Sequence, residues 1–168
     1  SSGLRRSMPT LRASGSHQAP MPQMTRSGAR SSRVRKVAAN KPMLRSAVLR
    51  SLAQIYDNIG DLGNARALYQ ESADLERLPG SGRPLVLAQM LNRVALAASN
   101  DGKAAEGEAP ARESLALRIR HAGPESLEAA DSHAILGLVL TGMRRAPEAR
   151  EHLEKSLAIR LAIQGEKS

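Results

Sequence analysis

The chain has 168 residues, 41% of them hydrophobic, which is enough for one domain of ordinary size with its own core. It contains no cysteine, which excludes a disulfide framework, a thiolate nucleophile and a zinc site with sulfur ligands. Its apolar runs are far shorter than the roughly 20 residues of a membrane-spanning helix, so we expect a soluble, cytoplasmic protein. The net charge of +9 comes from residues 1–41, which hold nine Lys and Arg and no acid, while the remainder is neutral.

Residues 1–41 are rich in Ser, Arg, Pro and Gly and show neither a helical nor an alternating period. Such a segment buries too little apolar surface to offset its ordering entropy, so we predict a disordered basic tail. A solvated leader, an arm for an anionic partner such as nucleic acid, and an organelle transit peptide all fit this composition. Because the chain does not begin with Met, read-through from upstream is a further interpretation.

From Pro42 onward the sequence repeats itself every 42 residues without a gap. Pro42 aligns with Pro84, and four further sets stay in step: Leu52, Val94 and Leu136; Ala53, Ala95 and Gly137; Ser72, Ser114 and Ser156; and Leu75, Leu117 and Ile159. The period divides this part of the chain into three units, residues 42–83, 84–125 and 126–168.

Each unit contains two amphipathic stretches with apolar residues at helical spacing. In the first unit they cover about 43–58 and 62–77, with stripes of Leu49, Leu52, Ala53, Tyr56 and Ile59, then Leu62, Ala65, Leu68, Tyr69 and Leu75. Gly60 in the turn between them favours the left-handed conformation that ends a helix. The pattern predicts an all-α chain of three hairpins and six helices, in which Pro110 delays or kinks the fourth helix.

The first unit carries a spaced motif: Leu52-Ala53-x-x-Tyr56, Gly60-Asp61-Leu62, Ala65 and Tyr69. It resembles the tetratricopeptide repeat consensus. The period of 42 and unit ends such as Ser156-Leu157-Ala158-Ile159-Arg160 are similar to the longer kinesin-light-chain-like subclass, which occurs in bacterial signalling proteins and C-terminal to bacterial serine/threonine kinases. The resemblance implies a right-handed α-solenoid that serves as a non-catalytic scaffold for protein-protein interaction. Arg144 departs from the consensus, because it replaces Gly60 in the third unit.

In this family the first helices of successive repeats line a concave groove that receives a peptide or a partner helix. The resemblance places eight polar residues of this chain there: Arg50, Gln54 and Asn58 from the first unit, Gln89, Asn92, Arg93 and Asn100 from the second, and Asp131 from the third. Asn and Gln can bond a peptide backbone through a donor and an acceptor, and Arg can bind a carboxylate bidentately. The alternative interpretation is that these are ordinary solvated residues on a polar helix face.

The last amphipathic stretch carries an apolar strip that no following repeat in the sequence covers, formed by Leu153, Leu157, Leu161 and Ile163. Stacked hairpins need a polar cap on their outermost surfaces. The strip therefore indicates a truncated longer array, a self-association face, or tolerance of a small exposed patch, and we favour truncation.

No sequence pattern indicates catalysis, a cofactor or a metal. Gly102-Lys103 lacks the other residues of a phosphate-binding loop and lies in a turn between helices. His133 and His152 can approach each other, but no third ligand at metal-binding spacing accompanies them, so packing or surface positions are favoured. Two alternatives to a free-standing adaptor stay open: the regulatory region of a serine/threonine kinase, and binding of nucleic acid or an anionic surface through the basic tail. Nucleic acid is disfavoured, because the repeat region is neutral and lacks an aromatic stacking platform.

Overall fold

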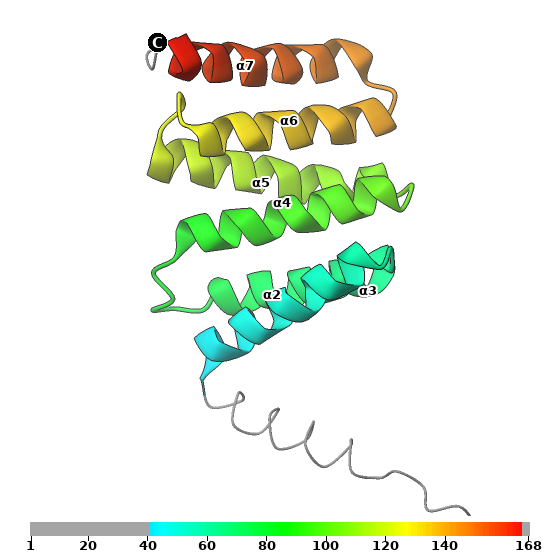
Figure 1. Cartoon of the computed structure of the whole chain (residues 1–168), viewed down its shortest axis with the longest axis vertical. Helices are drawn as coiled ribbons and strands as arrows, with labels where there is room; N and C mark the ends of the chain where they lie inside the picture. Colours follow the sequence, from blue (N-terminus) through cyan, green and yellow to red (C-terminus); the bar gives the residue numbers. More distant parts are fainter. Residues whose placement is uncertain (1–40, 166–168) are drawn as a thin grey trace, which may run out of the picture.

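The computed structural model describes residues 41–165, and this part of the chain forms six α-helices (Figure 1). The helices are α2 (Pro42–Asn58), α3 (Leu62–Glu76), α4 (Pro84–Asn100), α5 (Ala104–Ala122), α6 (Leu127–Gly142) and α7 (Ala146–Gly165). The predicted all-α fold with six helices is confirmed. The disordered basic tail predicted for residues 1–41 lies outside the described residues, except for Lys41.

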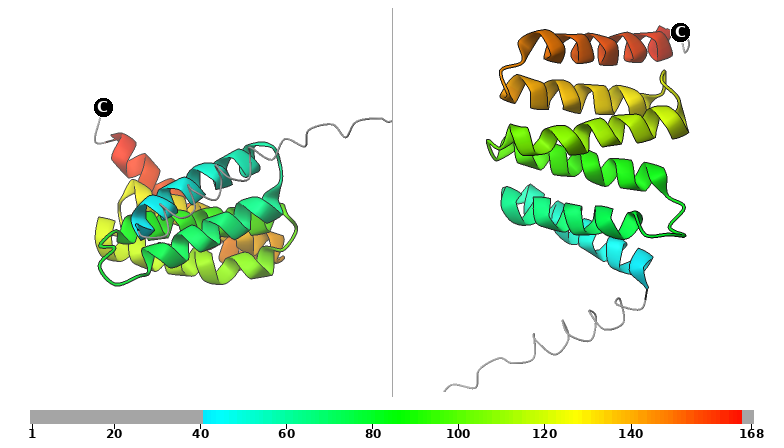
Figure 2. Two further views of the ribbon diagram at one scale, coloured as in Figure 1. Left: turned by 90° about the horizontal axis from the view of Figure 1, so that it is seen from below. Right: turned by 180° about the vertical axis from the view of Figure 1, so that it is seen from behind.

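The helices pack pairwise as three antiparallel hairpins, α2–α3, α4–α5 and α6–α7, stacked along one axis with α2 and α7 at the two ends (Figures 1 and 2). Successive hairpins are joined where α3 packs on α4 and α5 packs on α6. Helix α4 also contacts α6, so the first helices of the second and third hairpins lie side by side. This is the architecture of tetratricopeptide-like repeats.

Prolines and side-chain caps define where the helices begin. Pro42 and Pro84 start α2 and α4, where a missing N–H removes no intrahelical hydrogen bond. At the start of α3 the Asp61 carboxylate accepts a hydrogen bond from the amide three residues later, at 3.2 Å. The Ser126 hydroxyl does the same at the start of α6, at 3.1 Å. Each cap satisfies an amide that has no partner within the helix.

The same tight turn closes all three hairpins. Its central residue adopts a left-handed conformation, with φ of 82° at Gly60, 74° at Gly102 and 59° at Arg144. In each turn this residue donates its amide to the carbonyl three residues back, and the next residue donates to the carbonyl five residues back, at 2.8 to 3.1 Å. Arg144 therefore keeps a turn that glycine forms in the other two hairpins, although its Cβ makes that conformation unfavourable.

Glycines allow the two helices of the second and third hairpins to approach closely. Gly107 of α5 lies against Ala95 of α4, and a Cβ added to Gly107 would stand 2.8 Å from the Ala95 carbonyl oxygen. In the third hairpin the glycine is on the other helix, where a Cβ on Gly137 would stand 3.1 Å from the Ala149 carbonyl oxygen. Glycine at position 107, where the other two units have Ala65 and Ala149, is thus a packing requirement of that hairpin.

Pro110 does not delay the start of α5. The helix runs from Ala104 through Pro110 to its end, so the late start proposed from the sequence is wrong. Proline removes the amide that would bond the Glu106 carbonyl. However, Ala104 and Ala111 on either side are buried, and α5 packs along both α4 and α6. These tertiary contacts outweigh a local cost of about 3 kcal/mol.

The first hairpin contains a buried carboxylate with a defined set of partners. The Glu76 side chain is fully buried and accepts hydrogen bonds from Arg83, at 2.6 Å from Nη2 and 3.1 Å from Nε. The buried Ser46 hydroxyl also donates to it, and Ser72 bonds Ser46 at 2.9 Å. Because a buried charge is tolerated only when it is paired, Arg83 is required to neutralise the Glu76 carboxylate at the C-terminal end of α3.

Candidate functional site

One side of the stack is hollowed where α4 and α6 lie side by side. The described residues form an open pocket there with a volume of about 330 Å³, within the range of ligand sites in proteins. The pocket is lined by Gln89, Asn92, Arg93 and Leu96 of α4, by Asp131, Ala134 and Ile135 of α6, and by Arg118 of α5 and Arg160 of α7.

Half of the residues that the sequence assigned to a partner groove line this pocket. These are Gln89, Asn92, Arg93 and Asp131. Three others, Arg50, Gln54 and Asn58, lie on α2, and Asn100 is exposed at the last position of α4. A role in binding stays a prediction for all eight.

Asp57 connects α2 to the pocket, because its carboxylate lies 3.9 Å from Nη1 of Arg93. Gln54 donates to Asn58 Oδ1 at 3.0 Å and accepts a hydrogen bond from the Tyr69 hydroxyl at 3.4 Å. Burial and the nearby Asp57 carboxylate raise the pKa of Tyr69, so its hydroxyl stays protonated and can donate. The polar groups of α2 are thus tied to one another and to α3.

Asn92 has a structural role that its sequence position does not reveal. Its side chain is only 3% exposed, and Nδ2 donates to the Ser132 hydroxyl of α6 at 3.0 Å. Ser132 in turn bonds Ser114 of α5 at 3.1 Å. This chain of buried groups fixes three helices beneath the pocket. In the described part of the chain Asn92 Oδ1 is buried without a partner, which leaves one acceptor unsatisfied at the pocket floor.

Two arginines at the pocket were not among the predicted site residues. Arg118 of α5 is buried, donates to the Glu128 carbonyl at 2.8 Å and lies 3.8 Å from Asp131. Burial lowers the pKa of Arg118, an effect that Asp131 opposes, and its Nε has no partner among the described residues. Arg160 of α7 occupies the same position in the following repeat and pairs with Asp131. The sequence signal that could have found them is their equivalent position, 42 residues apart, near the ends of the second and third units.

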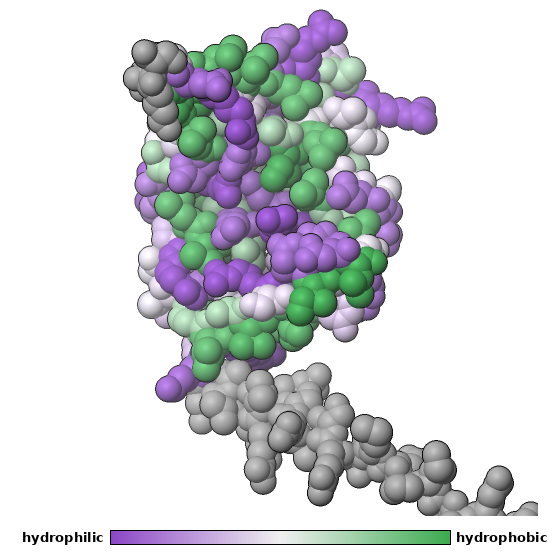
Figure 3. Space-filling view, viewed as in Figure 1, coloured by the Kyte–Doolittle hydropathy of each residue, from purple (hydrophilic) through white to green (hydrophobic). Residues whose placement is uncertain are grey.

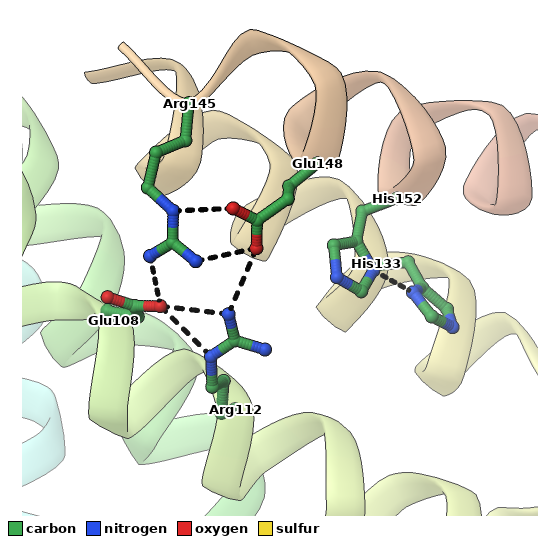
Figure 4. Close-up of polar contacts among 6 residues, drawn as sticks. All are labelled: Glu108, Arg112, His133, Arg145, Glu148 and His152. Carbon is green, nitrogen blue, oxygen red and sulfur yellow. Dashed lines mark hydrogen bonds and ion pairs between the residues drawn. The ribbon is translucent and has the colours of Figure 1, made fainter. Parts of the chain in front are cut away.

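An ion-pair network joins the second and third hairpins away from this pocket (Figure 4). Arg145, in the turn before α7, contacts Glu108 of α5 and Glu148 of α7 at 2.6 Å. Arg112 of α5 bonds Glu108 at 2.8 Å and lies 3.6 Å from Glu148. These hydrogen bonds lower the pKa of both glutamates and raise that of Arg145. Because the groups are solvated, the network sets the geometry of the repeat junction more than its stability.

The two histidines of the third hairpin form a pair beside this network (Figure 4). Nδ1 of His133 lies 2.9 Å from Nδ1 of His152, and their rings stack with centroids 5.1 Å apart. Burial and the neighbouring imidazole lower the pKa of His133, and burial lowers that of His152. Within residues 41–165 no third ligand joins them, as no group of three His, Cys, Asp or Glu residues suits a metal. The stacked rings join α6 to α7.

Residues 87–128 and 134–166 match the profile of the tetratricopeptide repeat family. A search of curated protein sequences found no match. Residues 87–166 therefore consist of tetratricopeptide repeats of the kinesin-light-chain-like type. Modules of this kind typically mediate protein-protein interaction and lack catalytic activity. Within the described residues, no helix has the length and apolar character needed to cross a bilayer.

Proposed function

We propose that the pocket between α4 and α6 binds an extended segment or a helix of a partner protein. The observation that supports this proposal is the convergence of amide and guanidinium groups on one hollow, with Ala134 and Ile135 as its apolar wall. Ligand sites combine such apolar walls with a few polar groups that fix orientation. Gln89 is exposed at the rim and offers both a donor and an acceptor to a peptide backbone.

The charge of the pocket favours an acidic partner segment. The pocket is lined by three arginines, Arg93, Arg118 and Arg160, but by only one carboxylate, that of Asp131. Arg160 and Asp131 form an exposed ion pair, and pairs of this kind contribute little stability because water screens them. A carboxylate of the partner can therefore compete with Asp131 for the guanidinium groups, and arginine binds carboxylates bidentately.

Calorimetric titrations of pocket variants test this function. A display-selected peptide that binds the full chain would be measured by calorimetry against Arg93→Ala, Arg160→Ala and the control Arg120→Ala, whose exposed side chain is outside the pocket lining. We expect each pocket variant to weaken binding by about tenfold, which is the effect of losing about 1.4 kcal/mol, and the control to bind as the wild type does. Equal affinities for all four proteins would refute the proposal.

The wider setting is a proposal that rests on the similarity of the repeat. We propose a cytoplasmic module within a larger bacterial signalling protein, and as a more specific alternative the regulatory region C-terminal to a serine/threonine kinase. Both rest on the resemblance of the 42-residue repeat to the kinesin-light-chain-like subclass. Identifying the full-length polypeptide in its source by mass spectrometry would test them, because kinase motifs would have to precede these repeats.

The basic tail supports a competing function of another class, binding to nucleic acid or an anionic surface. Residues 1–41 carry all of the excess positive charge. This alternative predicts that duplex DNA binds the full chain with a steep salt dependence, about −0.9 in log K per phosphate contacted, and that removal of the tail abolishes binding. The pocket variants would then have no effect.

A further inference from the structure

The interface that joins the first and second hairpins has two complementary faces. On α3, Tyr69 and Ala73 present one face, and on α4, Met90 and Val94 present the other. All four are buried in one apolar cluster. Hairpins thus stack through the second helix of one hairpin, here α3, and the first helix of the next hairpin, here α4.

Equivalent helices make the next junction, and three of the four positions are the same. One repeat further along, Ala111 and Leu115 of α5 pack against Leu136 and Val139 of α6, and these four residues are again buried in one cluster. Tyr69 corresponds to Ala111 and Val94 to Leu136 at the 42-residue offset. The contact is therefore a repeated feature of the fold.

The two ends of the stack expose the unused copies of these faces. On α7 the equivalent residues are Leu153 and Leu157, which are 43% and 57% exposed. On α2 they are Leu52 and Ile55, which are 42% and 57% exposed. Figure 3 shows hydrophobic residues on both ends of the stack. Each end thus exposes large apolar side chains whose counterparts on the inner helices are buried.

We propose that a second copy of this chain covers these faces, with α7 of one copy packed on α2 of the next as α5 packs on α6. The association is head-to-tail, because the two faces belong to opposite ends of the stack. A heterologous contact of this kind does not close on itself, so assembly proceeds stepwise with concentration. Burial of the four apolar side chains supplies the driving force.

Charge at the junction agrees with this arrangement. Between the second and third hairpins, Glu108 of α5 pairs with Arg145 at 2.6 Å. At the 42-residue offset, the corresponding residues across a head-to-tail junction are Arg150 of α7 and Asp61 of the next copy. The signs are reversed and this pair is attractive, whereas the same two positions at the junction of the first and second hairpins hold two cations, Arg66 and Lys103. A contact of α7 with α7, or of α2 with α2, has no counterpart inside the molecule.

Single-end variants of the full chain test the proposal. Leu157→Glu places a charge on the α7 face, and Ile55→Glu places one on the α2 face. Both residues are exposed, so the fold should be retained, which circular dichroism would verify. Leu85→Glu is the matched control, because Leu85 is exposed on the middle hairpin, away from both ends. Sedimentation velocity would be measured from about 1 µM to about 1 mM, which spans the dissociation constants of weak assemblies.

We expect the wild type and the control to grow in mass with concentration, and each end variant to stay monomeric. An equimolar mixture of the two end variants should form 1:1 dimers that do not grow, because one intact α7 face and one intact α2 face remain. Self-association of Ile55→Glu alone would indicate pairing of α7 with α7 and overturn the proposal, and dimers of Leu157→Glu alone would do so through α2. A monomeric wild type at every concentration would also overturn it.

Discussion

Replacement of Arg144 by glycine should stabilise the third hairpin. Arg144 is the central residue of the turn between α6 and α7, with φ of 59°, and glycine holds the same turn in the other two hairpins. Its side chain is exposed and forms no ion pair with any residue in the described range. The substitution therefore changes the backbone preference of the turn and removes no contact.

The expected gain follows from two opposing terms. A residue with a Cβ in the left-handed region costs about 1 to 2 kcal/mol relative to glycine. Glycine loses more conformational entropy on folding, which offsets about 0.4 to 1 kcal/mol of that gain. We expect a net stabilisation of about 0.5 to 1 kcal/mol, which corresponds to a rise in Tm of about 2 to 5 °C.

Thermal and urea unfolding followed by circular dichroism would measure the change, and hydrogen exchange would locate it. Because repeat proteins interact only through neighbouring units, slower exchange should be confined to the α6–α7 turn and the adjoining helices. Arg144→Ala is the control, since it removes the charge and keeps the Cβ. If Arg144→Gly were no more stable than Arg144→Ala, the argument from the left-handed turn would be refuted.

Three further predictions concern the packing of Gly107, the titration of His133 and the buried Glu76 carboxylate. Gly107→Ala should destabilise by about 1 kcal/mol or more although alanine is the better helix former, because the new Cβ meets the backbone of α4; a more stable variant in urea unfolding would contradict this. Burial and the adjacent His152 lower the pKa of His133, so the unfolded state takes up the proton more readily, and stability should be full above the ordinary imidazole pKa of about 6.5 and fall at lower pH. His133→Leu should reduce that loss in unfolding at about pH 5 relative to about pH 8, and an unchanged pH dependence would exclude this histidine as its source. Arg83→Met leaves the Glu76 carboxylate buried without its cation and should cost about 2 kcal/mol, discounted because Arg83 is 35% exposed. Adding Glu76→Gln to that variant should recover part of the loss, and no recovery would show that the buried charge is not its cause.

The sequence predicts the number and order of the helices because the 42-residue repeat supplies three aligned copies of each helical pattern. A stretch that is ambiguous in one copy is identified by its counterparts in the others. It does not predict which apolar residues are core. Leu52 and Ile59 share a stripe with Ala53, yet Leu52 and Ile59 are exposed and Ala53 is buried. A helix in a stack has apolar residues both for its own hairpin and for the neighbouring repeat, and periodicity cannot tell these two faces apart.

For a related reason, the sequence predicts only some of the residues that line the pocket. The resemblance assigns the groove to first helices, so it includes Gln89 and Arg93 but omits Arg118 and Arg160, which reach the pocket from the ends of second helices. The resemblance places Asn92 in the groove, but its side chain is buried and bonds Ser132, which lies 40 positions away in the sequence. Contacts between repeats determine both which arginines reach the pocket and whether Asn92 is buried. The sequence of a single unit does not contain these contacts.

The central claim is that the hollow between α4 and α6 is where this chain binds another protein. Chemical-shift mapping of the full chain with a selected acidic peptide tests it most directly. We predict the largest changes at Gln89, Arg93, Asp131 and Ile135, saturating together with the affinity measured by calorimetry. Changes confined to the ion-pair network around Arg145, or to residues 1–41, with no change at these four, would contradict it.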